Sequence, residues 1–189
     1  MTVYKVVMID TEAYGDVAYT ISIFKKVLSQ PEFLKYTAGI TLQAYLLNAW
    51  DIQTELLEFA KQRQDNGGAP LEMRLVKGRA ILMENILCEK RGWESPVRTD
   101  KKDVDANYMH ILERAMMMEN AKALRIGIAT HNLYSIAYAY LLSRKMNTPK
   151  HCFRFEMLEG IANHVIRTLS KRDVQVLVHV PMVANAEYK

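Results

Sequence analysis

The sequence has few of the features that mark the common classes of binding protein. It carries 25 Lys and Arg against 21 Asp and Glu, and the cations are spread along the chain rather than gathered in one tract. A nucleic-acid-binding protein usually collects its cations in a basic patch or stripe. The sequence therefore predicts no nucleic-acid partner, although a net charge of +4 suits a small anionic cofactor.

Cysteine and long apolar runs are equally scarce. Cys88 and Cys152 stand far apart, without CxxC or metal-ligand spacing, so we expect two reduced thiols and no metal site. No run approaches the roughly 18 apolar residues of a membrane helix. The start, MTVYKVVMID, is charged at Lys5 and resembles a strand more than a signal peptide. These absences predict a cytoplasmic protein.

Strand-like and helix-like segments alternate along the whole chain. The strand-like segments are VYKVVMI, GITLQAY, LEMRLVKG, LRIGIATHN, CFRFEML and VQVLVHVPMV. Alternation without hairpin turns predicts parallel βα units, either in a TIM barrel or in a doubly wound sheet. The sequence contains neither GxGxxG nor GxxxxGK[ST], so the familiar nucleotide-binding turns are missing.

Polar residues recur where the predicted strands end, at Asp10, Gln43, Lys77, Thr130 and His131. The carboxyl ends of parallel strands build the active sites of α/β folds, and this repetition favours a barrel. We therefore predict an α/β fold, a partial TIM-like (β/α)8 barrel with about six parallel strands alternating with helices. It would form one domain over residues 1–189.

Two aspartates and one long connection carry local predictions. Asp51 and Asp103 each precede an apolar helical pattern and are candidate N-caps. The connection RGWESPVRTDKK, residues 91–102, is longer than a routine loop, so we expect it to cover a ligand.

Arg74 raises the main question, because it lies inside an apolar strand. It alternates with Met73 and Leu75 and so faces the opposite side of the sheet. A cation there needs an anionic or polar partner. From the residues alone, Arg74 forms an internal salt bridge with Glu72 or Asp10, or it meets a ligand.

Seven short segments together resemble the catalytic domain of proline dehydrogenase, in the form found in bifunctional proline utilisation enzymes. The resemblance covers essentially the whole chain in register. Its segments are IDTE at 9–12, LQAY at 42–45, RLVKG at 74–78, GW at 92–93 with DVDANY at 103–108, ATHNL at 129–133, FEMLEG at 155–160 and VHVPMV at 178–183.

This resemblance implies a distorted TIM barrel that binds FAD, oxidises L-proline to 1-pyrroline-5-carboxylate and passes electrons to a quinone at the membrane. A cytoplasmic protein peripheral to the membrane would suit that reaction. Asp10 and Arg74 match the catalytic positions, and Leu158 matches a wall of the proline pocket. The positions that match cofactor contacts are Gln43, Val76, Lys77, Gly78, Arg98, Thr99, Asp100, Thr130, His131 and Asn132.

The sequence departs from the family pattern at several places. Arg79 and Ala80 follow the Lys-Gly pair where the family has Ala-Tyr or Ala-Asn, and His179 replaces a tyrosine. The resemblance begins at the third barrel strand and stops before the helix whose paired arginines bind the proline carboxylate. The domain is therefore expected to be incomplete at both ends and inactive alone, with open sheet edges that allow self-association. The alternative is a non-catalytic barrel that binds flavin weakly or assembles with a partner chain.

Overall fold

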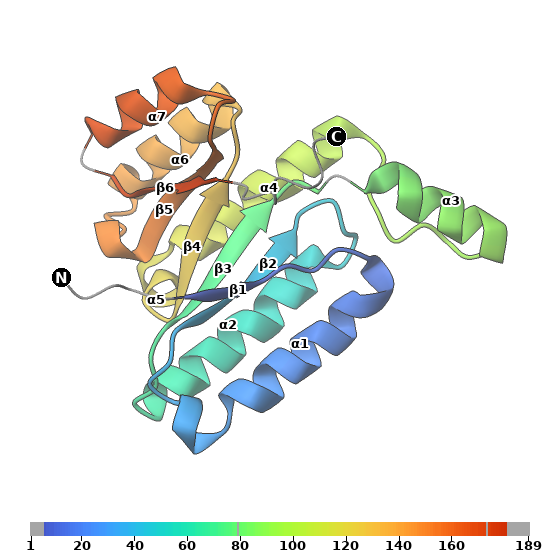
Figure 1. Cartoon of the computed structure of the whole chain (residues 1–189), viewed down its shortest axis with the longest axis horizontal. Helices are drawn as coiled ribbons and strands as arrows, with labels where there is room; N and C mark the ends of the chain where they lie inside the picture. The colour runs from blue at the N-terminus through green and yellow to red at the C-terminus, as the bar shows by residue number, and fades with distance from the viewer. Residues whose placement is uncertain (1–5, 79, 173, 181–189) are drawn as a thin grey trace, which may run out of the picture.

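Six parallel strands form one curved sheet in the computed structural model, which describes residues 6–78, 80–172 and 174–180. The strands are β1 (Val7–Ile9), β2 (Ala38–Gln43), β3 (Leu71–Val76), β4 (Leu124–Ala129), β5 (Phe153–Leu158) and β6 (Val176–His179). Each pairs in parallel with the next along the chain, and the sheet curls into an open half-barrel (Figure 1). The predicted partial barrel is confirmed.

Helices connect the strands and lie around the outside of the curve (Figure 1). They are α1 (Tyr14–Leu28), α2 (Ala49–Asp65), α3 (Ile81–Arg91), α4 (Lys101–Met116), α5 (Met118–Ala121), α6 (Leu133–Lys145) and α7 (Asn163–Ser170), with 3-10 turns η1 (Pro31–Phe33) and η2 (Lys150–Cys152). Only α3 projects away from the barrel, beyond the carboxyl end of β3 (Figure 1). No helix within the described ranges has both the length and the apolar character needed to cross a bilayer.

The core lies between the sheet and these outer helices. Alternate strand residues such as Ile40, Leu75 and Phe155 are at most 1% exposed and pack against helical stripes such as that of Ile21 and Phe24 on α1. Burying each such side chain contributes about 1.5–3 kcal/mol. The apolar faces of β2 to β5 are thereby buried on the convex side, which leaves their other residues to line the inside.

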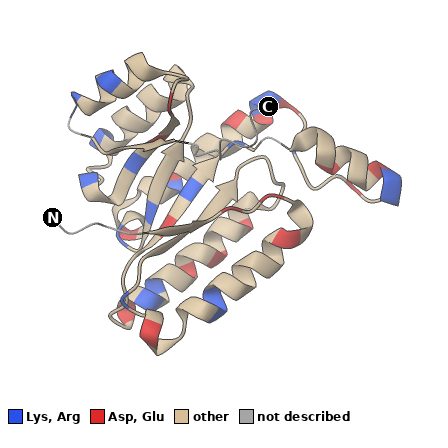
Figure 2. Cartoon of the chain, viewed as in Figure 1, with Lys and Arg blue, Asp and Glu red and all other residues tan. Residues whose placement is uncertain are grey.

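The concave face of the sheet is polar. Strand register places Thr41 beside Arg74, Arg74 beside Gly127, and Gly127 beside Arg154. Figure 2 shows charged residues of both signs within the strands of the sheet. A TIM barrel is usually filled by branched apolar side chains at these positions. Here the inner positions carry charges, and they form the site.

The structure corrects two predicted helix caps. Helix α2 begins at Ala49 after Asn48, so Asp51 lies in the first turn instead of capping the helix. Helix α4 is capped by Asp100, whose carboxylate accepts a hydrogen bond from Lys102 N at 2.7 Å, and Asp103 lies in the first turn. Both first-turn aspartates still stabilise their helices, because a negative charge near the N-terminus interacts favourably with the positive end of the helix dipole. The predicted last strand ends at His179, and residues 181–183 of its motif, like Arg79, lie outside the described residues.

Candidate functional site

Arg74 occupies the centre of the concave face and forms two ion pairs. Its Nη1 donates to Asp10 Oδ1 at 2.8 Å, and its Nε donates to Glu156 Oε2 at 2.6 Å. Asp10 also accepts a hydrogen bond from Thr41 Oγ1 at 2.5 Å. Of the two partners that the sequence allowed for Arg74, the structure selects Asp10 and adds Glu156. Glu72 instead pairs with Arg154.

Glu156 is the most heavily bonded carboxylate of this group. Its Oε1 accepts from Arg154 at 2.8 and 2.9 Å, and its Oε2 lies 2.9 Å from His179 Nε2 as well as bonding Arg74. Burial acts to raise the pKa of Glu156, but the charges of Arg154 and Arg74 outweigh burial and hold that pKa below its ordinary value. Glu156 and Glu72 in turn raise the pKa of Arg154 against the effect of burial. Glu156 and Arg154 are therefore both charged at neutral pH.

Gln43, at the end of β2, has an incomplete set of hydrogen bonds. Its Nε2 donates to Thr11 O at 2.5 Å, whereas its buried Oε1 has no partner within the described part of the chain. A buried amide oxygen without a donor costs free energy, about 1–3 kcal/mol. The end of β2 is thus suited to a ligand that offers an N–H or O–H group.

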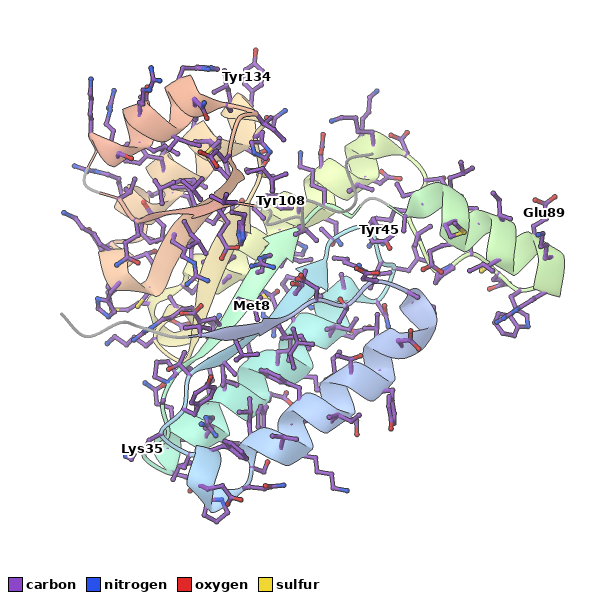
Figure 3. All side chains as sticks on the ribbon, in the orientation of Figure 1. Met8, Lys35, Tyr45, Glu89, Tyr108 and Tyr134 are labelled. Carbon is purple, nitrogen blue, oxygen red and sulfur yellow. The ribbon has the colours of Figure 1, made fainter. Side chains whose placement is uncertain are left out.

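Gly78, after β3, is held in a conformation that requires glycine. Its φ is +107°, and an added Cβ would lie 1.9 Å from the ring of Tyr45. The ladder between β2 and β3 continues to this point, because Tyr45 N donates to Lys77 O at 2.9 Å. Figure 3 shows Tyr45 at the carboxyl end of β2. The backbone of Gly78 therefore packs directly on a buried aromatic ring.

Lys77 is already paired with a carboxylate of helix α4. Its Nζ lies 2.6 Å from Asp105 Oδ1 and 5.5 Å from the ring centre of Tyr108. Burial acts to raise the pKa of Asp105, but bonds from Lys101 and Lys77 outweigh it and lower that pKa. The position of Lys77 at a strand end did not predict this ion pair.

The connection between α3 and α4 is fastened along the extension of β2. Arg98 N donates to Tyr45 O at 2.7 Å, its Nη1 donates to Leu46 O at 3.4 Å, and Leu47 N donates to Pro96 O at 2.9 Å. Thr99 follows Arg98, and Asp100 caps α4. The three predicted cofactor residues of this segment therefore lie beside the carboxyl end of β2, and covering a ligand stays a prediction.

The segment after β4 forms a turn that reaches toward β5. Asn132 caps α6 by accepting from Ser135 N at 3.0 Å, and its own N donates to Thr130 Oγ1 at 3.1 Å. His131 Nε2 accepts a hydrogen bond from Leu158 N at 3.0 Å. Because Nε2 is the acceptor, the proton of a neutral His131 lies on Nδ1. Leu158, predicted as a substrate contact, is 44% exposed at this end of the sheet.

A cavity of about 740 Å³ opens on the concave face. Its lining includes the charged and polar side chains Glu72, Arg74, Arg125, Arg154 and His179, together with Met8, which Figure 3 labels on β1. Among the residues that the structure describes, no group of three or more His, Cys, Asp or Glu side chains is arranged to hold a metal ion.

Sequence reasoning missed three members of the site. No sequence pattern singles out Glu156 or Arg154, and His179 differs from the family pattern without indicating a partner. The available signal was the two-residue period of β5, which places Arg154, Glu156 and Leu158 on the same face of the sheet.

A comparison with protein families matches residues 2–188 to the family described as proline dehydrogenase. The chain belongs to the proline dehydrogenase family. "Proline dehydrogenase 1" of Bacillus subtilis is 27% identical over 175 residues, covering 93% of this chain and 49% of that protein. The chain thus spans about half the length of the curated relatives that it matches.

Solved structures of proline utilization A (PutA) share the fold. PutA from Bdellovibrio bacteriovorus, inactivated by N-propargylglycine, matches with a TM-score of 0.87 and 34% identity, over 95% of this chain and 18% of that one. PutA from Corynebacterium freiburgense matches with a TM-score of 0.87 and 35% identity, over 93% of this chain and 18% of that one. The site described above therefore lies in a barrel that shares the fold of these PutA structures.

Proposed function

We propose that this chain acts as the flavin-binding part of a proline dehydrogenase that oxidises L-proline to 1-pyrroline-5-carboxylate. The observation that carries this proposal is the ion pair of Asp10 and Arg74 beside the unsatisfied amide of Gln43. All three belong to the segments that resemble the family. Asp10 follows β1 and Gln43 ends β2, at the carboxyl end of the parallel sheet where α/β enzymes bind ligands, and Arg74 reaches Asp10 from within β3.

The residues at this end fit FAD. The buried Oε1 of Gln43 needs a donor, and a flavin ring carries an N–H group at its polar edge. Arg74 offers a cation beside it that favours electron-rich forms of a ring. When bound, FAD accepts the hydride that leaves the substrate. The residues that would hold it are Gln43, Val76, Lys77, Gly78, Arg98, Thr99, Asp100, Thr130, His131 and Asn132.

Asp10 and Arg74 have distinct roles in this proposal. Arg74 supplies the positive charge, and its side chain is only 14% exposed, so water screens that charge little. Asp10 is 60% exposed and orients Arg74 from the open side, aided by Thr41. Leu158 gives the substrate an apolar wall, as its exposure at the same end allows.

The remaining partners are those that the family resemblance implies. Electrons leave to a quinone-type acceptor, with the protein in the cytoplasm and peripheral to the membrane. The edge strands β1 and β6 support self-association, because each pairs with one strand only within the described residues.

Visible absorption spectroscopy tests the proposal. The chain is titrated with FAD, and anaerobic L-proline is then added, with D-proline as the control ligand. A shifted flavin spectrum supports the site, and bleaching by L-proline but not by D-proline shows that this chain transfers a hydride from its substrate to FAD. Binding without bleaching would favour the non-catalytic barrel that binds flavin, and a chain that leaves the FAD spectrum unchanged would refute the proposal.

A matched pair of variants ties the result to the site. Arg74→Met removes the proposed cation, whereas Lys25→Met removes a cation paired with Glu55 on the outer helices. We expect Arg74→Met to weaken FAD binding and Lys25→Met to leave it unchanged.

A further inference from the structure

We propose that Glu156 is a positioning residue of this site, and that Gly127 provides the space in which its carboxylate holds Arg74. This proposal rests on the proposed function, in which Arg74 is the cation assigned to the flavin. It concerns a residue of β5 that acts through Arg74.

The geometry gives Glu156 the stronger hold on Arg74. The Glu156 side chain is fully buried and bonds Arg74 Nε at 2.6 Å, whereas the Asp10 side chain is 60% exposed. An exposed ion pair contributes little to stability, because water screens the two charges. Removing one partner of a buried ion pair is costly, because the other charge is left buried without compensation. The orientation of the guanidinium therefore depends chiefly on Glu156.

Glu156 itself cannot turn away, because both of its oxygens are engaged. Oε1 accepts two hydrogen bonds from Arg154, which is also tied to Glu72 at 2.6 Å. The second oxygen is shared between Arg74 and His179. A carboxylate only accepts hydrogen bonds, so His179 Nε2 carries a proton and does not compete as an acceptor for Arg74 Nη2, 3.5 Å away.

Gly127 on β4 makes this arrangement sterically possible. A Cβ at this position would lie 2.1 Å from Glu156 Oε1 and 2.7 Å from its Cδ. Its φ is not positive, so the backbone alone does not demand glycine. A glycine inside a strand weakens the strand and often marks close approach of another group. The group that approaches here is the Glu156 carboxylate.

Gly39 on β2 supplies a matched control. It also faces the inside of the sheet, and an added Cβ would lie 2.4 Å from Cε of Met8 and 3.1 Å from Cβ of Glu72. The flexible end of Met8 can move aside and Glu72 needs to shift by only a few tenths of an ångström, whereas the Glu156 carboxylate is fixed by its cations. Gly127→Ala and Gly39→Ala thus add the same methyl group to inner positions of β4 and β2, with different consequences.

The first test needs no cofactor. Hydrogen exchange of the Arg74 Nε–H group is followed in ¹H–¹⁵N spectra of the whole chain, with Arg74→Lys identifying the signal. We expect Gly127→Ala and Glu156→Asp to accelerate exchange about tenfold or more, as loss of a charged hydrogen bond implies. Gly39→Ala should leave it unchanged. Unchanged exchange in Gly127→Ala would overturn the proposal, and circular dichroism shows that each variant is folded.

The second test uses the FAD-loaded chain. Displacing a positioned group by about 1 Å can slow a reaction about a hundredfold. We therefore expect Gly127→Ala to slow flavin reduction by L-proline strongly while KM for proline stays unchanged. An equal loss in Gly39→Ala would show a general structural effect and overturn the positioning role. A wild-type chain that binds no FAD would instead refute the proposed function, while the exchange test would still decide whether Glu156 holds Arg74.

Discussion

Gly78→Ala is expected to destabilise the protein severely. Two separate costs are visible in the structure. A φ of +107° lies in a region that side chains other than glycine rarely adopt, and the added Cβ would lie 1.9 Å from the Tyr45 ring. Backbone strain of about 1–3 kcal/mol and overpacking of about 1–3 kcal/mol together lower the free energy of unfolding by about 2–6 kcal/mol. That is a large part of the 5–15 kcal/mol typical of a domain.

Gly92→Ala separates the two costs. Gly92 also has a positive φ, of +65°, but an added Cβ would meet nothing within 4 Å. Gly92→Ala should lower the free energy of unfolding by about 1–2 kcal/mol, which is the cost of the left-handed backbone conformation alone. Urea unfolding followed by circular dichroism measures both variants. If Gly78→Ala lost no more stability than Gly92→Ala, the contact with Tyr45 would contribute nothing and the reasoning would be refuted.

Three further results are expected. Arg63→Met should lower the free energy of unfolding by about 3 kcal/mol or more, because the backbone carbonyls that accept hydrogen bonds from Arg63 lose their donor. Lys26→Met, at an exposed position, should leave that free energy unchanged, and urea unfolding measures both variants. The folded pKa of Glu156 lies below its ordinary 4.5, so the stabilisation that Glu156 contributes is present above about pH 4.5 and is lost as pH falls through the folded pKa. In urea unfolding, Glu156→Gln should show a shallower loss of unfolding free energy than the wild type between about pH 6 and about pH 3. Asp105→Asn should release Lys77 and tighten FAD binding about two- to fivefold in a fluorescence titration, which is the contribution of a part-exposed ion pair. Weaker binding would contradict a role for Lys77 in holding FAD.

The fold was predictable because its signal is local. Each strand carries its own apolar face, and polar residues at the strand ends mark the side where the site lies. Parallel order followed from the absence of hairpin turns. The projection of α3 was not predictable, because Leu82 and Met83 give that segment an apolar character typical of a packed helix, yet they are 73% and 61% exposed.

The pairing inside the barrel was harder to predict. Period-two alternation tells which residues face inward, but Arg74 and Glu156 are 82 residues apart and lie on β3 and β5, with β4 between them. Only a glycine on the intervening strand lets their side chains meet. Lys77 likewise pairs with Asp105 because helix α4 lies beside the end of β3. No residue spacing in the sequence predicts that placement of α4.

The parallel sheet also constrains how copies of this chain can join. Within the described residues its two edges, β1 and β6, are different strands that run in the same direction. Continuing the sheet in parallel therefore requires β1 of one copy against β6 of another, a head-to-tail contact. Such contacts generate either a closed ring or a growing fibre. Assembly through these edges would thus be recognisable by its stoichiometry, a ring of fixed mass or a length that rises with concentration.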